Sequence, residues 1–220
     1  MQIKEMAENM GYEVLHGIVD CLWVQRRAYL GVQGGGLEQE TGILTEVDTY
    51  DWITFLPMSD GGGAYNRYFG RLNTGKMKIR GVMARKGDTP EYVNKMQQEV
   101  FEVLAEAKSL EDLRRIEPKA RLVYWEVYGR AGWSRCQGAA IHRRVSKLNY
   151  SRRCFEASAV QAHMKQGIPL APGMEIGYVI RDARKWEVDP EMTASKFDAA
   201  YYRGLLEKAW AEAAFVFAHS

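Results

Sequence analysis

Residues 13–24, EVLHGIVDCLWV, contain two apolar runs on either side of a short turn. β-Branched and aromatic residues around a turn that carries Gly17 and Asp20 predict a β-hairpin. Two-metal phosphoryl transfer needs several carboxylates fixed on rigid strands, and a turn with two acids one residue apart is one way to present them. Here Asp20 is the only acid, because Ile18 occupies the other position and has no oxygen for a hard cation. The hairpin therefore offers Asp20 as a single candidate catalytic and metal-binding residue.

The composition predicts a folded chain with enough apolar residues to bury a core. The 220 residues are 46% hydrophobic and include three widely separated cysteines, Cys21, Cys136 and Cys154. These cysteines lack the close paired spacing of structural zinc sites, so we expect free or buried thiols in a reducing compartment. No apolar run approaches the roughly 20 residues of a membrane span, and the polar N-terminal residues do not form a signal peptide. We therefore expect an intracellular protein without a membrane partner.

Charge is unevenly distributed along a chain whose net charge is only +2. Between Asp112 and Arg153 there are eleven Lys or Arg against three acids. A basic segment in a nearly neutral chain is typical of a nucleic-acid face, although such runs are also common on solvated surfaces.

The first part of the sequence predicts β-strands. The segments YDWITFLPM (50–58) and AYNRYFGRL (64–72) predict neighbouring strands, and in KMKIRGVMAR (76–85) Lys and Arg alternate with apolar residues. A period of two places one face of a strand on a core and the other outside, so we expect a basic outer face. The glycines at 34–36 and 61–63 lack the spacing of a phosphate-binding loop.

From Asp88 onward the pattern favours helices. DTPEYVNKMQQEVFEVLAEAKS (88–109) predicts a long amphipathic helix with Thr89 as N-cap. We further expect strands at 121–129 (RLVYWEVYG) and 174–180 (MEIGYVI), a helix at 151–167 capped by Ser151, and a closing helix at 195–217. Strands followed by helices favour an α+β fold with two modules.

Two sets of basic residues are candidates for binding nucleic-acid phosphates. The first alternates along the predicted strands beside an aromatic residue and consists of Arg67, Tyr68, Lys76, Lys78, Arg80, Arg85 and Lys86. The second clusters around a predicted helix start and consists of Arg143, Arg144, Lys147, Arg152 and Arg153.

Residues 11–24, GYEVLHGIVDCLWV, resemble the third polymerase motif of family B DNA polymerases, whose Tyr-Gly-Asp-Thr-Asp-Ser turn supplies metal-binding aspartates. Gly17 and Asp20 agree with that motif, and Ile18 replaces its first aspartate. The other positions hold His16, Val19 and Cys21.

Three later stretches strengthen the resemblance. Residues 66–88 are similar to the family's Lys-Lys-Arg-Tyr stretch, with Arg67 and Tyr68 matching and Asn66 replacing a lysine. The segment FEASAVQAHMKQGIPLAPGMEIGYVI (155–180) resembles the thumb helix and the Pro-Gly-x-x-Ile-x-Tyr-Val strand, and FDAAYYRGLLEKAW (197–210) resembles the Asp-x-x-Tyr-Tyr helix. The resemblance implies an α+β fold in which an antiparallel palm sheet fragment, residues 1–86, precedes a mostly helical thumb with a small β element, residues 87–220.

The resemblance also indicates which parts of a family B polymerase the four motifs do not cover. In the family, the exonuclease domain, the fingers and the first palm motif lie upstream, and nothing in this sequence corresponds to them. The chain looks most like part of an archaeal enzyme, either from the group with decayed catalytic motifs or from the small subunit of a split polymerase. We expect no cofactor in the isolated chain and Mg²⁺ only in an active site completed by another chain.

Three functions remain open at this point. The first is a module that grips primer-template DNA without catalysis in replication or repair, in the cytoplasm with the nucleoid. It would act with a second polypeptide that carries the exonuclease, the fingers and the rest of the palm, or it would self-associate. The second is a small subunit that contributes Asp20 to nucleotidyl transfer. The third is a protein-interaction scaffold that has lost DNA binding.

Overall fold

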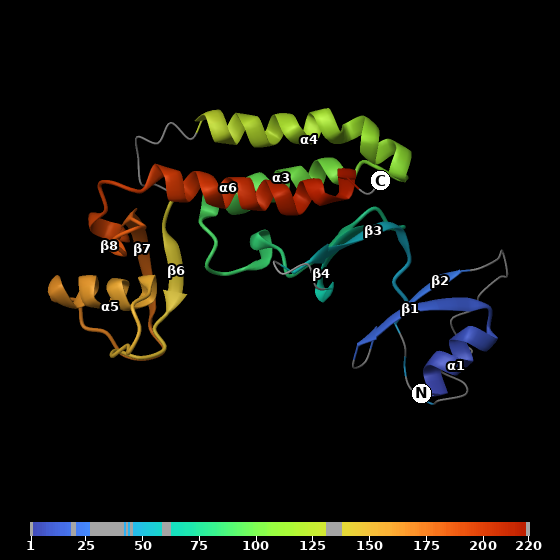
Figure 1. Cartoon of the computed structure of the whole chain (residues 1–220), viewed down its shortest axis with the longest axis horizontal. Coiled ribbons are helices and arrows are strands. Elements are labelled where there is room, and N and C mark those ends of the chain that lie inside the picture. Colours follow the sequence, from blue (N-terminus) through green and yellow to red (C-terminus); the bar gives the residue numbers. More distant parts are fainter. Residues whose placement is uncertain are drawn as a thin grey trace. The chain divides into compact units, whose positions relative to one another are not determined.

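The computed structural model describes residues 2–18, 21–26, 42, 44, 46–58, 63–130 and 138–218 (Figure 1). The chain divides into two compact units, Met1–Thr49 and Tyr50–Ser220. In the first unit, helix α1 (Gln2–Asn9) packs against strand β1 (Tyr12–Ile18). Strand β1 pairs in antiparallel fashion with β2 (Cys21–Arg26), which confirms the predicted hairpin.

The second unit contains elements of three kinds. Its strands are β3 (Tyr50–Pro57), β4 (Gly63–Leu72), β5 (Met77–Arg80), β6 (Ile141–Arg144), β7 (Glu175–Asp182) and β8 (Glu187–Pro190). Its α-helices are α3 (Glu91–Leu104), α4 (Leu110–Arg130), α5 (Phe155–Lys165) and α6 (Ala199–Ala214). Its short 3₁₀ turns are η1 (Met83–Arg85), η2 (Glu191–Thr193) and η3 (Phe215–Ala218).

Strands β3, β4 and β5 form an antiparallel sheet in that order, as the period-two pattern predicts. Thr54 pairs with Phe69 and Phe69 with Ile79, so these residues share one face of the sheet. Phe69 is fully buried and Ile79 packs against the same cluster of apolar side chains. This face is therefore the core face.

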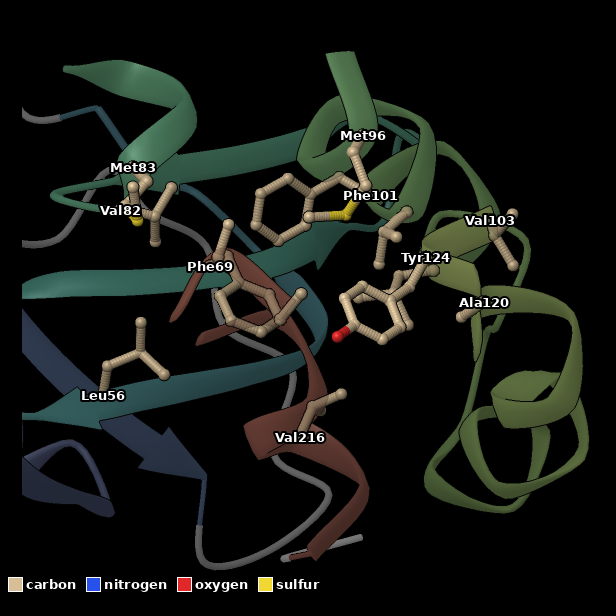
Figure 2. Packing of buried hydrophobic residues seen from close by; sticks show 14 of the residues in the cluster. Leu56, Phe69, Val82, Met83, Met96, Phe101, Val103, Ala120, Tyr124 and Val216 are labelled. Atoms are coloured by element: carbon tan, nitrogen blue, oxygen red, sulfur yellow. The ribbon is translucent and has the colours of Figure 1, made fainter. Parts of the chain in front are cut away.

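The first hydrophobic cluster lies between this sheet and the helices α3, α4 and α6, which run side by side in Figure 1. Figure 2 shows side chains from both layers converging, with Phe69 near Phe101 and with Tyr124 and Val216 in the same cluster. The rings of Phe69 and Phe101 have centroids 5.0 Å apart. Trp52 anchors the sheet by donating from its indole nitrogen to the carbonyl of Ala107, at 2.8 Å.

A second hydrophobic cluster fills the space between the antiparallel sheet β6–β7–β8 and helix α5. Helix α6 contributes to both clusters, because Tyr202 belongs to the second and Leu206 to the first. Tyr202 also accepts a hydrogen bond on its hydroxyl from the amide of Ile180, at 2.9 Å. The hydroxyl of Tyr92 on α3 donates to the carbonyl of Tyr202, at 3.0 Å.

The predicted α+β class is confirmed, with antiparallel sheets and packed helices. The predicted boundary between residues 86 and 87 stays a prediction about polymerase modules, and it falls inside the second compact unit. One predicted element is wrong, because RLVYWEVYG (121–129) lies in helix α4 and not in a strand. Two predicted caps are also wrong. Cys154, not Ser151, caps α5, and Pro90 occupies the N-cap position of α3 while the Thr89 hydroxyl donates to the carbonyl of Met83.

Candidate nucleic-acid interface

The sheet β3–β4–β5 presents part of the first basic set on the face opposite the core. Tyr68 pairs with Phe55 on one side and Arg80 on the other, and Gly70 pairs with Lys78. Directly paired residues share a face of a sheet, so Tyr68, Lys78 and Arg80 lie together on this second face. The rings of Tyr68 and Phe55 are in contact, with centroids 5.6 Å apart.

Three further cations of the first set lie beside this sheet and are exposed. Lys76 precedes β5, Arg85 ends the turn η1, and Lys86 follows it. Their exposure leaves them accessible to a large ligand, and their contact with DNA stays a prediction.

Arg67 has a different environment from the rest of the set. Its guanidinium donates to a side-chain oxygen of Glu212 at 2.7 Å, to the carbonyl of Pro57 at 2.9 Å and to the carbonyl of Gly81 at 3.3 Å. Every nitrogen of the guanidinium group therefore donates to a protein oxygen. Arg67 acts as a cross-link between β4 and the last helix, and its predicted contact with DNA would compete with these bonds.

Glu212 is the centre of the buried polar network to which Arg67 belongs. One carboxylate oxygen accepts from Arg67, and the other accepts from the amide of Met83 at 2.8 Å and from the side chain of Gln97 at 3.1 Å. Gln97, which is fully buried, also accepts from the amide of Ala84 at 2.6 Å. The network fixes η1 against α3 and α6, and so fixes the start of the segment that carries Arg85 and Lys86.

The second basic set begins on β6, next to a shallow hollow. Arg143 forms an ion pair with Asp88, which joins the segment after η1 to this strand. The hollow is lined by Gly87, Asp88, His142, Arg143, Arg144 and Glu175. The Arg143–Asp88 pair therefore brings the end of the first predicted set next to the beginning of the second, although about 55 residues separate them in sequence.

Arg144 ends β6, and Lys147, Arg152 and Arg153 lie between this strand and α5. All four are exposed. The Lys147 ammonium lies over the Tyr150 ring, 5.2 Å from its centroid. Tyr150 in turn donates to Glu156 at 2.7 Å. Burial opposes ionisation of Glu156, but hydrogen bonds from Tyr150 and Ser146 outweigh it and lower the pKa of this carboxyl group. Glu156 therefore stays ionised at neutral pH beside the second basic set, and it accepts hydrogen bonds from Tyr150 and Ser146.

Two cations that the sequence reading missed lie beside this set. Arg153 donates from its guanidinium to the carbonyl of Lys185, in the turn between β7 and β8 that also carries Arg184. The stretch RDARKW (181–186), directly after the predicted strand 174–180, is rich in charged residues, as a surface turn would be. No sequence pattern indicates which other segment that turn contacts.

The predicted catalytic and metal-binding residue Asp20 lies outside the described residues. Ile18, the replaced position of the motif, ends strand β1 and pairs with Cys21. Within the part of the chain that the structure describes, no three His, Cys, Asp or Glu side chains gather as a metal site would require. The prediction that Asp20 binds Mg²⁺ therefore stays a prediction.

None of the described helices combines the length and the apolar character needed to cross a lipid bilayer.

Comparisons with known proteins identify the chain's relatives. No family model matches the sequence. A DNA polymerase of Archaeoglobus fulgidus is 27% identical over 187 residues, which are 80% of this chain and 22% of that protein. DNA polymerase 2 of Saccharolobus solfataricus is 30% identical over 112 residues, which are 51% of this chain and 17% of that protein. The chain is a homologue of archaeal DNA polymerases.

The solved family B DNA polymerase of Pyrobaculum calidifontis matches this polymerase homologue over 99% of its length, with a TM-score of 0.60 and 25% identity. The match covers 28% of the Pyrobaculum chain. The homologue therefore corresponds to a portion of a family B polymerase, which confirms the resemblance predicted from its motifs. It spans about a fifth of the two curated relatives.

Proposed function

We propose that this polymerase homologue is a palm and thumb module that binds the phosphates of primer-template DNA and does not catalyse synthesis by itself. The observation that carries the proposal is the row of exposed cations from β6 to α5, on a chain related to archaeal DNA polymerases. Arg144 and Arg152 in this row form no side-chain ion pair or hydrogen bond with any residue that the structure describes. Their guanidinium groups are available to a polyanion.

Cations of this kind bind the DNA backbone without reading its sequence. Side-chain contacts to phosphate fix the position of a protein on the duplex and carry no base information. Each neutralised phosphate releases counterions, so the logarithm of the affinity falls linearly with the logarithm of the salt concentration. The module is therefore expected to bind DNA of any sequence and to lose affinity steeply as salt rises.

The proposal also gives the chain a partner. The homologue matches 28% of the Pyrobaculum polymerase. We propose that it acts with a second polypeptide that carries the exonuclease, the fingers and the rest of the palm, or that it self-associates. In this view the chain is a subunit or fragment that acts in DNA replication or repair. The replacement of an aspartate by Ile18 supports a degenerate metal-binding motif, since a hydrocarbon side chain cannot bind Mg²⁺.

The test is binding of the full chain to a fluorescent primer-template duplex over a salt titration. We compare the wild type with Arg144→Glu/Lys147→Glu and with Lys108→Glu/Lys208→Glu, a control with the same change in net charge outside both predicted sets. The first variant should bind more weakly and with a smaller salt slope than the control. Arg67→Glu is a poor probe, because it would place a second carboxylate against Glu212. Absence of binding by the wild type at low salt would refute the proposal.

A second assay tests the absence of catalysis. The chain alone, supplied with Mg²⁺, primer-template and nucleotides, should extend no primer. Extension that disappears in Asp20→Ala would show that the hairpin is catalytic, and would contradict this part of the proposal.

A further inference from the structure

The turn between β7 and β8 has a backbone conformation that a bulky side chain rarely adopts. Trp186 has a φ angle of 60°, in the left-handed region. This region is uncommon for residues other than glycine, and a large residue is held there only when its surroundings fix it. Such outliers are observed more often at sites with a function.

Contacts from two helices hold the turn in place. The Trp186 ring packs on Phe155, the first residue of α5, with ring centroids 4.6 Å apart. Asp198, the N-cap residue of α6, accepts a hydrogen bond from the amide of Ala183 at 2.9 Å. Within the turn, Asp182 accepts from the amide of Lys185 at 3.0 Å. These contacts therefore fix the conformation of the turn.

The same contacts assemble a group of cations from two distant segments. We name Arg152, Arg153, Arg184 and Lys185 the basic turn patch. All four are exposed, and Arg153 joins the segments by donating to the carbonyl of Lys185. Arg184, like Arg152, has no side-chain ion pair or hydrogen bond within the described part of the chain. Lys185 has only an exposed ion pair with Asp182, at 3.4 Å, and such pairs contribute little.

We propose that the basic turn patch binds phosphate as a unit, so that Arg184 and Lys185 extend the proposed interface from the row between β6 and α5 to the turn between β7 and β8. The proposal rests on the proposed function, because DNA is the polyanion that the row after β6 would bind. The positively charged groups are preassembled, so binding would order few side chains and backbone segments.

The surrounding aromatic rings indicate which part of DNA the patch contacts. Bases stack on exposed aromatic faces, whereas Trp186 packs on Phe155 and Phe155 packs on Tyr201, with centroids 5.6 Å apart. The patch therefore offers positive charge without a stacking surface. This chemistry fits the backbone of any sequence.

The experiment repeats the salt titration on the full chain with Arg184→Ala/Lys185→Ala. The matched control, Lys108→Ala/Lys208→Ala, removes two exposed charges elsewhere. If both patch residues contact a phosphate, the slope of log affinity against log salt should fall by about 1.8 in magnitude. That change corresponds to about 60-fold weaker binding at 0.1 M salt, with the two affinities converging near 1 M. Circular dichroism confirms that each variant is folded.

The outcomes separate the two proposals. If the wild type fails to bind the duplex at low salt, the proposed function fails and this inference fails with it. If the wild type binds, and Arg144→Glu/Lys147→Glu weakens binding while Arg184→Ala/Lys185→Ala behaves like its control, the basic turn patch is overturned and the proposed function stands. A slope reduced in the patch variant but not in its control supports the patch.

Discussion

Replacing Glu212 by glutamine tests the buried network beneath the sheet, because only the chemistry of one oxygen changes. All three groups that face the carboxylate are donors: Arg67 at 2.7 Å, the amide of Met83 at 2.8 Å and the side chain of Gln97 at 3.1 Å. A glutamine side chain has one acceptor oxygen and one NH₂ group. Whichever way the amide is turned, its NH₂ group points at a donor.

The size of the effect follows from what is lost. One hydrogen bond to a charged group contributes about 1.5–3 kcal/mol. Removing one member of a buried ion pair costs about 3–5 kcal/mol, because the other charge stays without compensation. Glu212 is 7% exposed but Arg67 is 25% exposed, so water solvates part of the arginine charge and reduces the penalty. We expect Glu212→Gln to lower the free energy of unfolding by about 3 kcal/mol.

The assay is thermal and urea unfolding followed by tryptophan fluorescence. For a chain of this size, 1 kcal/mol corresponds to about 2–4 °C, so Tm should fall by about 6–12 °C. Glu207→Gln is the matched control, because Glu207 lies on the same helix and is exposed. Its effect should stay within about 0.5 kcal/mol. Equal losses in the two variants would refute the claim that the Glu212 carboxylate holds the network together.

Three other predictions concern stability. Gly81→Ala should cost more than about 1 kcal/mol in thermal unfolding, because φ is +65° and a Cβ would lie 2.6 Å from the carbonyl of Asn66; an unchanged Tm would contradict this. Trp52→Phe removes the hydrogen bond to Ala107 and should lower the free energy of unfolding, measured in urea, by about 1–3 kcal/mol. A smaller loss would argue against that bond. Burial raises the pKa of Tyr178 to about 12, above its ordinary value of 10.0, so the contribution of Tyr178 to stability should be constant below pH 10 and fall between pH 10 and 12. The urea midpoint should fall between pH 9 and pH 11, and this fall should be smaller in Tyr178→Phe than in the wild type.

The strands were predictable because their signal is local. Alternation in residues 76–80 puts Met77 and Ile79 on the core cluster and Lys78 and Arg80 on the other face, as expected from the period of two. The wrong strand at 121–129 is rich in aromatic and β-branched residues, which favour strands locally. In α4 the same residues pack at helical spacing, with Ala120, Tyr124 and Val127 on the first hydrophobic cluster. Tertiary packing therefore overrides local propensity in this helix.

The site was less predictable because it depends on contacts between distant residues. The sequence identified Arg67 as basic and next to an aromatic residue, but not that it donates to a carboxylate 145 residues later. It likewise identified Arg152 and Arg153, but not that Lys185 lies beside them, because no local pattern encodes which turn meets which segment. The N-cap predictions were wrong for a local reason. Serine is the commoner N-cap, but at Cys154 the sulfur accepts the bond from Ala157.

Helix α6, which contributes to both hydrophobic clusters, has a consequence for how the protein is made. Leu206, Ala209 and Val216 share a cluster with Trp52 and Phe69, which leave the ribosome much earlier. The nascent chain cannot close this core until residues near 216 have been synthesised, and contacts between such distant residues form slowly. Until then the apolar face of β3–β4–β5 stays exposed to other nascent chains, as in other folding intermediates. Chaperone binding to stalled chains that end before residue 199 should therefore exceed binding to the full-length protein.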